Sequence, residues 1–185
     1  MSERDRPWAY RGWHWANSLI LSLSLFTVAL RKTFLSSKSM ATVIQRELLA
    51  KGVVVNEAQT KVAARAVRDE MWEWHFKLGF VLVGLLVFRL VFVKWPLPRF
   101  QSLKESVHGS FYVALSVMGI TGLSMYYSGL LGLSQGVVDG VQEVHETLLW
   151  YFVGFLVLHL AGVVRAEMRG EPGLVSSMIH GKKRH

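Results

Sequence analysis

Apolar residues in this chain gather into four blocks that are separated by polar and charged segments. A helix needs about 20 mainly apolar residues to cross the hydrocarbon core of a bilayer, and each block is close to that length. The pattern therefore predicts an all-α fold, an integral membrane four-helix transmembrane bundle. The expected spans are broadly residues 12–35, 74–93, 107–127 and 144–164.

The connection between the first two spans, residues 36–73, is long and polar, and its residues favour helix. Ser39 is placed to cap the helix "MATVIQRELLAKG", and Gly52 to end it. Asn56 is placed to cap "EAQTKVAARAVRDEMWEW", which can continue into the second span. We expect an extended, helical first loop at the membrane surface. It serves either as a solvated cap over the outer face or as a docking surface for a redox partner.

The other two connections are shorter. "KWPLPRF", residues 94–100, is predicted to be a proline-broken turn, and residues 128–140 a glycine-rich loop. The amino end, the second connection and the carboxyl tail share one side and are rich in lysine and arginine, whereas residues 128–143 contain neither. The positive-inside rule therefore places both termini in the cytoplasm. The basic residues of the first loop are discounted because that loop is long and also acidic.

Residue content narrows the chemistry. The chain has no cysteine, which excludes disulfides, thiolate-ligated iron–sulfur clusters, covalent c-type haem and thiol catalysis. Its formal net charge is +8, and the basic residues flank the spans. We therefore attribute the charge to anionic lipid headgroups and not to nucleic acid. Too little polar chain remains for a soluble domain, so residues 1–185 are predicted to form a single membrane domain.

Histidines are the strongest chemical signal, because five of the seven lie in or at the ends of the spans. An ionisable group at such depth is costly and is a functional candidate by default. His145 and His159 are 14 residues apart, which is nearly four helical turns. Both side chains therefore leave one face of the helix, separated by about 21 Å along its axis. One imidazole thus lies near each membrane surface.

The alternation of the spans matches four histidines in two pairs. His14 and His159 lie at the inner level, and His75 and His145 at the outer level. Two such pairs are what two haem irons with two axial imidazoles each require. A packed, hydrogen-bonded role is the alternative for any single histidine, and zinc is poorly served by two histidines alone. His108, at the inner end of the third span, could bond a haem propionate, help bind a quinone or cap the span.

Basic residues and glycines give weaker signals. Haem propionates are carboxylates that need cations, and the alternative for each cation is a snorkelling membrane anchor. The candidates are Arg11, Arg89 and Arg165 at the inner level and Arg31 and Lys77 at the outer level. Glycines would let a macrocycle or a neighbouring helix approach; they are Gly79, Gly84, Gly119, Gly122, Gly154 and Gly162.

Several motifs resemble the prokaryotic cytochrome b561 family, which includes the b-type cytochrome subunits of membrane-bound hydrogenases. They are "RGWHWANSLI", "WEWHFKLGF" and "VHGSFYVAL" at the starts of three spans, "HE" followed 13 residues later by "H" in the fourth, and the tail "GEPGLVSSMIHGKKRH". The resemblance implies a bundle with two haem b groups, ligated by the residues that match His14, His75, His145 and His159. It also implies electron transfer in the bacterial inner membrane, with a quinone at one end.

These features favour a di-haem b-type cytochrome that relays electrons between a redox partner protein and the quinone pool. The alternatives are a stand-alone superoxide oxidase that reduces quinone, and a non-redox transporter or structural bundle. An electron-transfer subunit is favoured over a stand-alone enzyme, and no catalytic residue is assigned. The long first loop, 36–73, fits a soluble or peripheral partner at the outer face better than an open funnel for a small anion. Membrane lipid and quinone are the other expected partners, and a homodimer is an open alternative.

Overall fold

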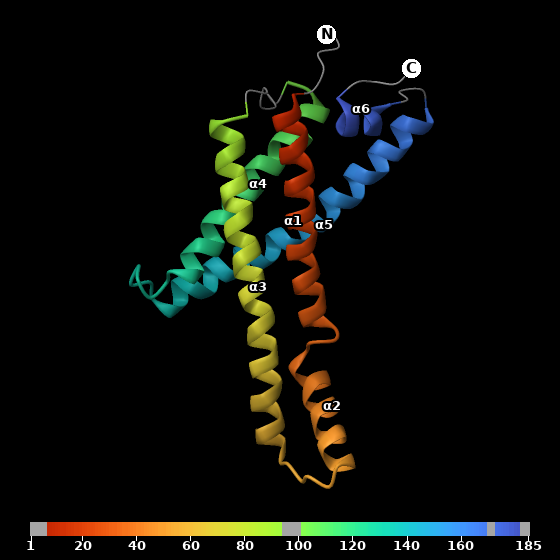
Figure 1. Ribbon diagram of the computed structural model, residues 1–185. Coiled ribbons are helices and arrows are strands. Elements are labelled where there is room, and N and C mark those ends of the chain that lie inside the picture. Colours follow the sequence, from red (N-terminus) through yellow and green to blue (C-terminus); the bar gives the residue numbers. More distant parts are fainter. Residues whose placement is uncertain (1–6, 94–100, 170–172, 182–185) are drawn as a thin grey trace. The chain divides into compact units, whose positions relative to one another are not determined.

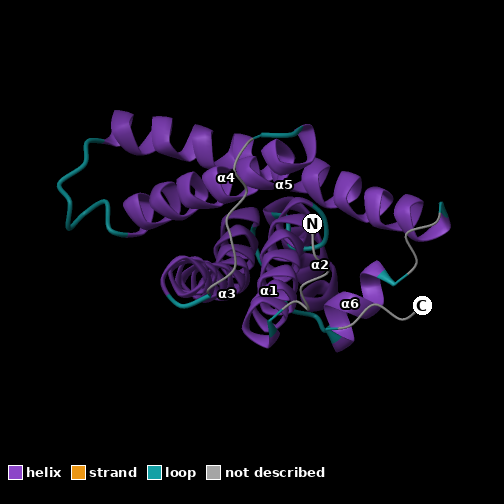
Figure 2. Ribbon diagram, turned by 90° about the horizontal axis from the view of Figure 1, so that it is seen from above, coloured by secondary structure: helices purple, strands orange, loops and turns teal. Residues whose placement is uncertain are grey.

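The computed structural model describes residues 7–93, 101–169 and 173–181, which form helices joined by turns (Figure 1, Figure 2). No strand occurs in these ranges, so the all-α prediction is confirmed. Within them, four helices are long and apolar enough to cross a membrane, which confirms the predicted membrane fold. The helices are α1 (Trp8–Lys32), α2 (Ser37–Ala50), α3 (Glu57–Val91), α4 (Leu103–Tyr126), α5 (Gln135–Met168) and α6 (Leu174–His180).

The chain divides into two compact units. One comprises Met1–Leu19 and Leu82–His185, and the other Ile20–Val81. The first unit therefore contains the start of α1, the end of α3, and helices α4 to α6. Within it, α4 and α5 pack side by side as an antiparallel pair (Figure 1, Figure 2). The second unit contains the rest of α1, all of α2 and most of α3.

Several helix boundaries differ from the predicted ones. α1 ends at Lys32, before the predicted residue 35, because the Leu35 N–H turns back to the Leu30 carbonyl at 2.8 Å. α3 is one continuous helix, which confirms that the segment after Asn56 runs on into the second span. α5 begins at Gln135, so the second half of the predicted glycine-rich loop is helical. The predicted turn at residues 94–100 lies outside the described residues.

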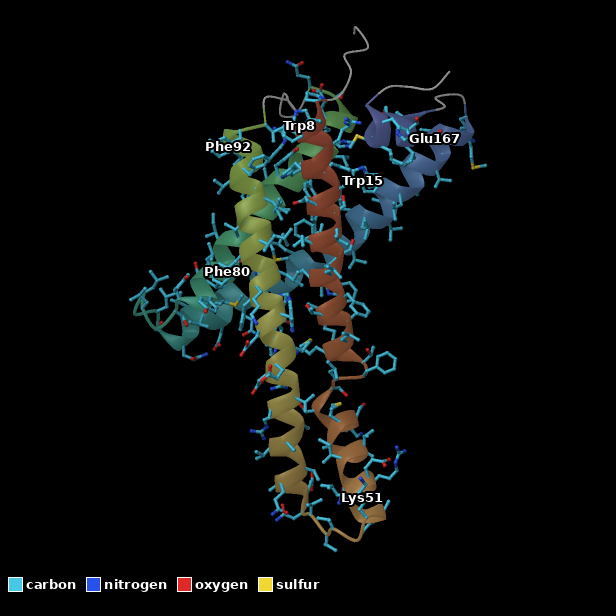
Figure 3. The ribbon with its side chains drawn as sticks, in the orientation of Figure 1. Trp8, Trp15, Lys51, Phe80, Phe92 and Glu167 are labelled. Atoms are coloured by element: carbon cyan, nitrogen blue, oxygen red, sulfur yellow. The ribbon has the colours of Figure 1, made fainter. Side chains whose placement is uncertain are left out.

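The spans carry many of their large apolar side chains on the outside. Trp8, Phe80 and Phe92, which are labelled in Figure 3, are 79%, 39% and 65% exposed. Only 6% of the most apolar stretch of α5 is buried. Apolar surface of this extent is a liability in water, whereas a lipid-facing helix requires it. These helices are therefore built for a bilayer.

Both ends of α2 are closed by local hydrogen bonds. Its N-cap is Ser36, whose Oγ accepts from the Ser39 N–H at 3.3 Å, so the predicted cap at Ser39 is wrong. The helix begins earlier because Ser36 already has extended backbone and a hydroxyl three residues before an unpaired N–H. The predicted stop at Gly52 is confirmed: its φ is 77°, and its N–H bonds to the Leu49 carbonyl at 2.9 Å.

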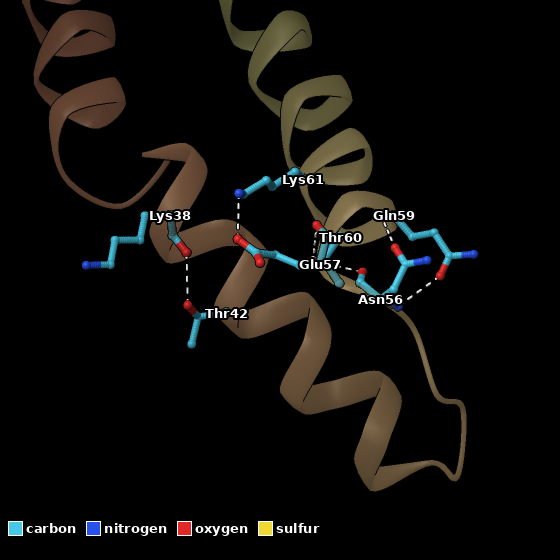
Figure 4. A network of polar contacts seen from close by, with 7 residues as sticks. All are labelled: Lys38, Thr42, Asn56, Glu57, Gln59, Thr60 and Lys61. Carbon is cyan, nitrogen blue, oxygen red and sulfur yellow. Dashed lines mark hydrogen bonds and ion pairs between the residues drawn. The ribbon is translucent and has the colours of Figure 1, made fainter.

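The start of α3 is fixed by a reciprocal pair of hydrogen bonds. Asn56 Oδ1 accepts from the Gln59 N–H, and Gln59 Oε1 accepts from the Asn56 N–H, both at 2.9 Å (Figure 4). This capping box satisfies two N–H groups that the helix would otherwise leave unpaired, and it confirms the predicted cap at Asn56. Glu57 forms an ion pair with Lys61 one turn further on, but an exposed pair of this kind adds little stability.

The short helix α6 is attached to its unit at both ends. At its start, the Glu167 carboxylate accepts hydrogen bonds from the Gly173 N–H at 3.0 Å and the Val175 N–H at 2.8 Å. At its end, Arg11 Nη1 donates to the Ile179 carbonyl at 2.8 Å. Glu167 is labelled in Figure 3. Arg11 belongs to α1 and Glu167 to α5. The helix α6 is therefore bonded to the start of α1 and to the end of α5.

Loss of the Glu167 charge is expected to loosen α6. Glu167 lies beyond the apolar stretch 144–164, and its hydrogen bonds from Val175 and Gly173 lower the pKa of its carboxyl below 4.5. The attachment is therefore complete above the ordinary glutamate value and is lost as the pH falls through the lowered value. Hydrogen-exchange protection factors of residues 173–180 should fall in that acidic range.

The Glu167→Gln variant provides the control for this prediction. A neutral amide oxygen is a weaker acceptor than a carboxylate, so protection of the Gly173 and Val175 amides should be lower at neutral pH. In this variant, the protection of these amides should also no longer change as the pH falls through the acidic range. Equal protection in the two proteins at neutral pH would show that the carboxylate does not hold α6.

Candidate functional site

Three of the candidate histidines come together in the unit that contains α4 to α6. The ring centroids of His14 and His159 are 6.1 Å apart, and those of His108 and His159 are 6.2 Å apart. A metal–imidazole bond is about 2 Å long and the ring centre lies about 1 Å beyond the nitrogen, so two axial imidazoles on one metal have centres roughly 6 Å apart. The spacing of either pair therefore fits bis-imidazole ligation of a haem iron.

Aromatic neighbours orient the rings of this cluster. Phe155 lies one turn before His159 on α5 and stacks on its ring, with the centroids 5.8 Å apart and the planes inclined by 7°. Phe111 of α4 contacts Phe155 in turn, at 4.8 Å between centroids. Trp15 packs edge-on against His14 at 5.6 Å. Such contacts restrict ring rotation, so α1, α4 and α5 all contribute to the placement of these imidazoles.

His145 lies against α4 in the same unit. Its Nδ1 is 3.0 Å from the Thr121 hydroxyl oxygen, which also bonds to carbonyls of its own helix. The next residue, Gly122, lies close beneath the ring: a Cβ at that position would be 3.2 Å from His145 Cε1. Because no larger residue fits there without displacing the imidazole, the glycine allows the close approach of α5 to α4.

His75 belongs to the other unit. Its Nδ1 is 2.8 Å from the hydroxyl oxygen of Thr27, which donates to the Ser24 carbonyl at 2.6 Å. Trp72 packs edge-on against the His75 ring at 5.0 Å, and the Arg31 guanidinium lies 5.0 Å from the Trp72 centroid. The predicted pairing of His75 with His145 joins the two units and stays a prediction.

Arg89 is enclosed by aromatic side chains. It is 2% exposed, and its guanidinium lies between 5.4 and 5.6 Å from the rings of Tyr10, Trp13 and Tyr112. Its Nε donates to the Tyr112 hydroxyl at 3.2 Å and its Nη1 to the Val93 carbonyl at 3.1 Å. Cation–π attraction and these hydrogen bonds compensate for the loss of water around the charge.

Of the other candidate cations, Arg11 and Arg165 lie near helix ends and Lys77 lies within α3. Lys77 forms an ion pair with Glu73 at 3.2 Å, and Arg165 is exposed in the last turn of α5. Arg11 donates to α6, but its Nε is buried without a hydrogen-bond partner. A guanidinium has five donors and binds carboxylates in a planar fork. The unused donor makes Arg11 the cation here that best fits a haem propionate.

Within the described ranges, no three or more histidine, cysteine, aspartate or glutamate side chains converge closely enough to hold a metal ion. The imidazoles that come together within one unit are the pairs His14–His159 and His108–His159. Such a pair suits a haem iron, since the porphyrin occupies the remaining equatorial positions.

Sequence reasoning missed Thr27 and Thr121. Each interrupts an apolar run, which is a weak signal because a threonine hydroxyl in a helix usually bonds to a carbonyl of its own helix. It also missed the aromatic enclosure of Arg89, although the aromatic residues at the start of α1 were visible. Their convergence depends on α1, α3 and α4 packing together.

A family model described as prokaryotic cytochrome b561 matches residues 5–181 of this chain. No curated protein and no solved structure matches the chain. The family match includes every span histidine and both attachments of α6.

Proposed function

This chain belongs to the prokaryotic cytochrome b561 family, and from that premise we propose that it relays electrons between a redox partner protein and the quinone pool through two b haems. Family membership makes it a membrane b-type cytochrome that binds haem b and transfers electrons. The partner, the quinone and the number of haems are the proposed part.

The ring spacing of the inner histidines carries the proposal. The 6.1 Å between the centroids of His14 and His159 supports these two as axial ligands of one haem. His75 and His145 are proposed as the ligands of the second haem because the alternation of the spans puts them at one membrane level. In each of them the Nδ1 atom is engaged by a threonine, which supports ligation through Nε2.

When bound, haem iron supplies one-electron oxidation and reduction. His14, His75, His145 and His159 would hold the two irons through their imidazole nitrogens. Phe155 and Trp15 orient the inner imidazoles. The chain's own work is therefore to place two one-electron carriers at different depths of the membrane.

Cationic side chains would neutralise the haem propionates. Arg11, Arg89 and Arg165 are proposed for the inner haem, and the buried unpartnered Nε of Arg11 supports its role most directly. Lys77, which pairs with Glu73, is proposed for the outer haem. His108 is assigned first to a propionate and second to a quinone carbonyl, on the basis of its ring contact with His159.

The partner is proposed to dock on the cap formed by α2 and the first turns of α3, residues 36–73. We also propose that the protein lies in the bacterial inner membrane with both termini in the cytoplasm, since the segment after α4, residues 128–143, contains no lysine or arginine. Fast reduction of the purified chain by superoxide, with no other protein present, would favour a stand-alone superoxide oxidase instead.

A pyridine haemochrome assay with a reduced-minus-oxidised spectrum, on detergent-purified protein, tests the proposal. We expect two b haems per chain with low-spin bands. One haem per chain would contradict the proposed relay of electrons between two haems. Five-coordinate, high-spin spectra would contradict bis-imidazole ligation.

Replacing Gly122 with alanine is expected to weaken the haem that His145 ligates. The new Cβ would lie 3.2 Å from His145 Cε1 and 3.7 Å from Nδ1, so the ring has to shift. Changes to groups that orient a metal ligand cost about tenfold or more in affinity. Transfer of haem to excess apomyoglobin should therefore become about tenfold faster for one haem and stay unchanged for the other.

Gly140→Ala is the matched control, because nothing lies within 4 Å of a Cβ at that helical position. Its haem transfer should match that of the unaltered protein. Equal behaviour of the Gly122→Ala and Gly140→Ala proteins would contradict the role assigned to the contact with His145.

A further inference from the structure

The single proton of the Thr27 hydroxyl determines the tautomer of His75. Thr27 Oγ1 lies 2.6 Å from the Ser24 carbonyl oxygen and 2.8 Å from His75 Nδ1. A carbonyl oxygen accepts and never donates, so the hydroxyl proton goes to Ser24. His75 Nδ1 is therefore the donor to the threonine oxygen. This makes His75 the Nδ1–H tautomer and leaves the lone pair on Nε2.

Thr121 makes the same arrangement with His145. Its hydroxyl donates to the carbonyls of Val117 at 2.8 Å and Met118 at 3.0 Å, and its oxygen lies 3.0 Å from His145 Nδ1. Because the hydroxyl proton goes to these carbonyls, His145 Nδ1 is the donor to Thr121 Oγ1. His145 is therefore held as the Nδ1–H tautomer too.

The two threonines are well placed to act on the imidazoles. Thr27 is 8% exposed and Thr121 9% exposed, so bulk water competes little for their hydroxyls. They lie on different helices, α1 and α4, and contact histidines of α3 and α5, each within its own unit. Both histidines are proposed ligands of the same haem.

We propose that Thr27 and Thr121 are positioning residues that fix Nε2 as the iron-binding nitrogen of His75 and His145 and increase its basicity. The inference rests on the proposed function. A ring N–H that donates to an oxygen makes the opposite nitrogen a stronger donor to the metal. A stronger donor stabilises oxidised iron more than reduced iron, so the two hydroxyls lower the midpoint potential of the haem that these histidines hold.

Valine substitutions test this on the full chain, since valine keeps the shape of threonine and removes the hydroxyl. For Thr27→Val we expect the ratio of reduced to oxidised haem at a fixed potential to rise about tenfold, a midpoint shift of about 59 mV. Thr121→Val should also raise the midpoint potential of the same haem. The midpoint potential of the other haem should not change.

Two sets of controls separate the hydroxyl from packing. Thr27→Ser and Thr121→Ser keep the hydroxyl and should stay near the original midpoint. Thr147→Val removes a hydroxyl that bonds to the Glu143 carbonyl at 2.8 Å on α5, and it should leave both midpoints unchanged. If a valine variant loses its haem, the haem content of the corresponding serine variant is measured. Haem retained in the serine variant supports the role of the hydroxyl, and haem lost from it contradicts that role.

Nitrogen-15 spectra of the full-length protein, as purified and reduced, report the tautomers directly. Protons on Nδ1 of His75 and His145 support the inference, and protons on Nε2 overturn it, whether or not two haems are present. Unchanged midpoints in both valine variants, at full haem content, also overturn it. If Thr27→Val shifts the midpoint potential of one haem and Thr121→Val that of the other, the positioning role of the threonines is supported. Only the pairing of His75 with His145 is then contradicted.

Discussion

Replacing His14 with alanine should reduce the haem content of the purified protein from two b haems per chain to one. The inner iron would keep the imidazole of His159 alone, and a haem held by one axial ligand dissociates readily during purification. His159→Ala should give the same loss, because its ring and that of His14, with centroids 6.1 Å apart, are proposed to serve one iron. The pyridine haemochrome assay measures both.

Double variants and a variant of His108 identify which histidines bind the same haem. The protein with both His14→Ala and His159→Ala should retain one haem, whereas combining His14→Ala with His145→Ala should leave none. His108 lies as close to His159 as His14 does, with 6.2 Å between ring centroids. His108→Ala should nevertheless keep both haems. Loss of a haem from His108→Ala, with retention in His14→Ala, would assign the inner ligand to α4 in place of α1.

Replacing Arg89 with alanine is expected to destabilise the protein by about 4 kcal/mol. The change removes two hydrogen bonds from a charged group, to Tyr112 and Val93, each worth about 1.5–3 kcal/mol. It also removes the contacts of the guanidinium with three aromatic rings, at up to about 2 kcal/mol when desolvated. Relief of the buried charge offsets part of this loss. Reversible unfolding in mixed detergent micelles measures the difference.

Graded variants distinguish the enclosure from the charge alone. Arg89→Lys keeps the charge but not the planar fork, so it should lose about half as much stability. Tyr112→Phe removes the acceptor of the Nε bond and should cost about 1–3 kcal/mol, because a buried charged donor is left unpaired. Arg165→Ala, at an exposed position of α5, should stay within about 0.5 kcal/mol. Similar stabilities for Arg89→Ala and Arg165→Ala would contradict the role assigned to the enclosure.

Features that depend on neighbouring residues in the chain were accessible from the sequence. The four spans follow from apolar length against bilayer thickness, and the shared face of His145 and His159 follows from the helical repeat. The cap at Asn56 is equally local, because its two hydrogen bonds join residues three apart. The cap of α2 was misplaced because Ser36 and Ser39 are both suitable, and backbone geometry selects the earlier serine.

The sequence by itself determined that this is an all-α membrane protein of the cytochrome b561 family, and it predicts histidines at two membrane levels, because these properties reside in length, period and motif. Only the tertiary structure decided which groups surround each imidazole: Thr27 for His75, Thr121 and Gly122 for His145. It also decided that Arg89 is enclosed. The reason is physical, since such contacts depend on how each helix is rotated and shifted against its neighbours. That placement is set by side-chain packing between segments far apart in the chain.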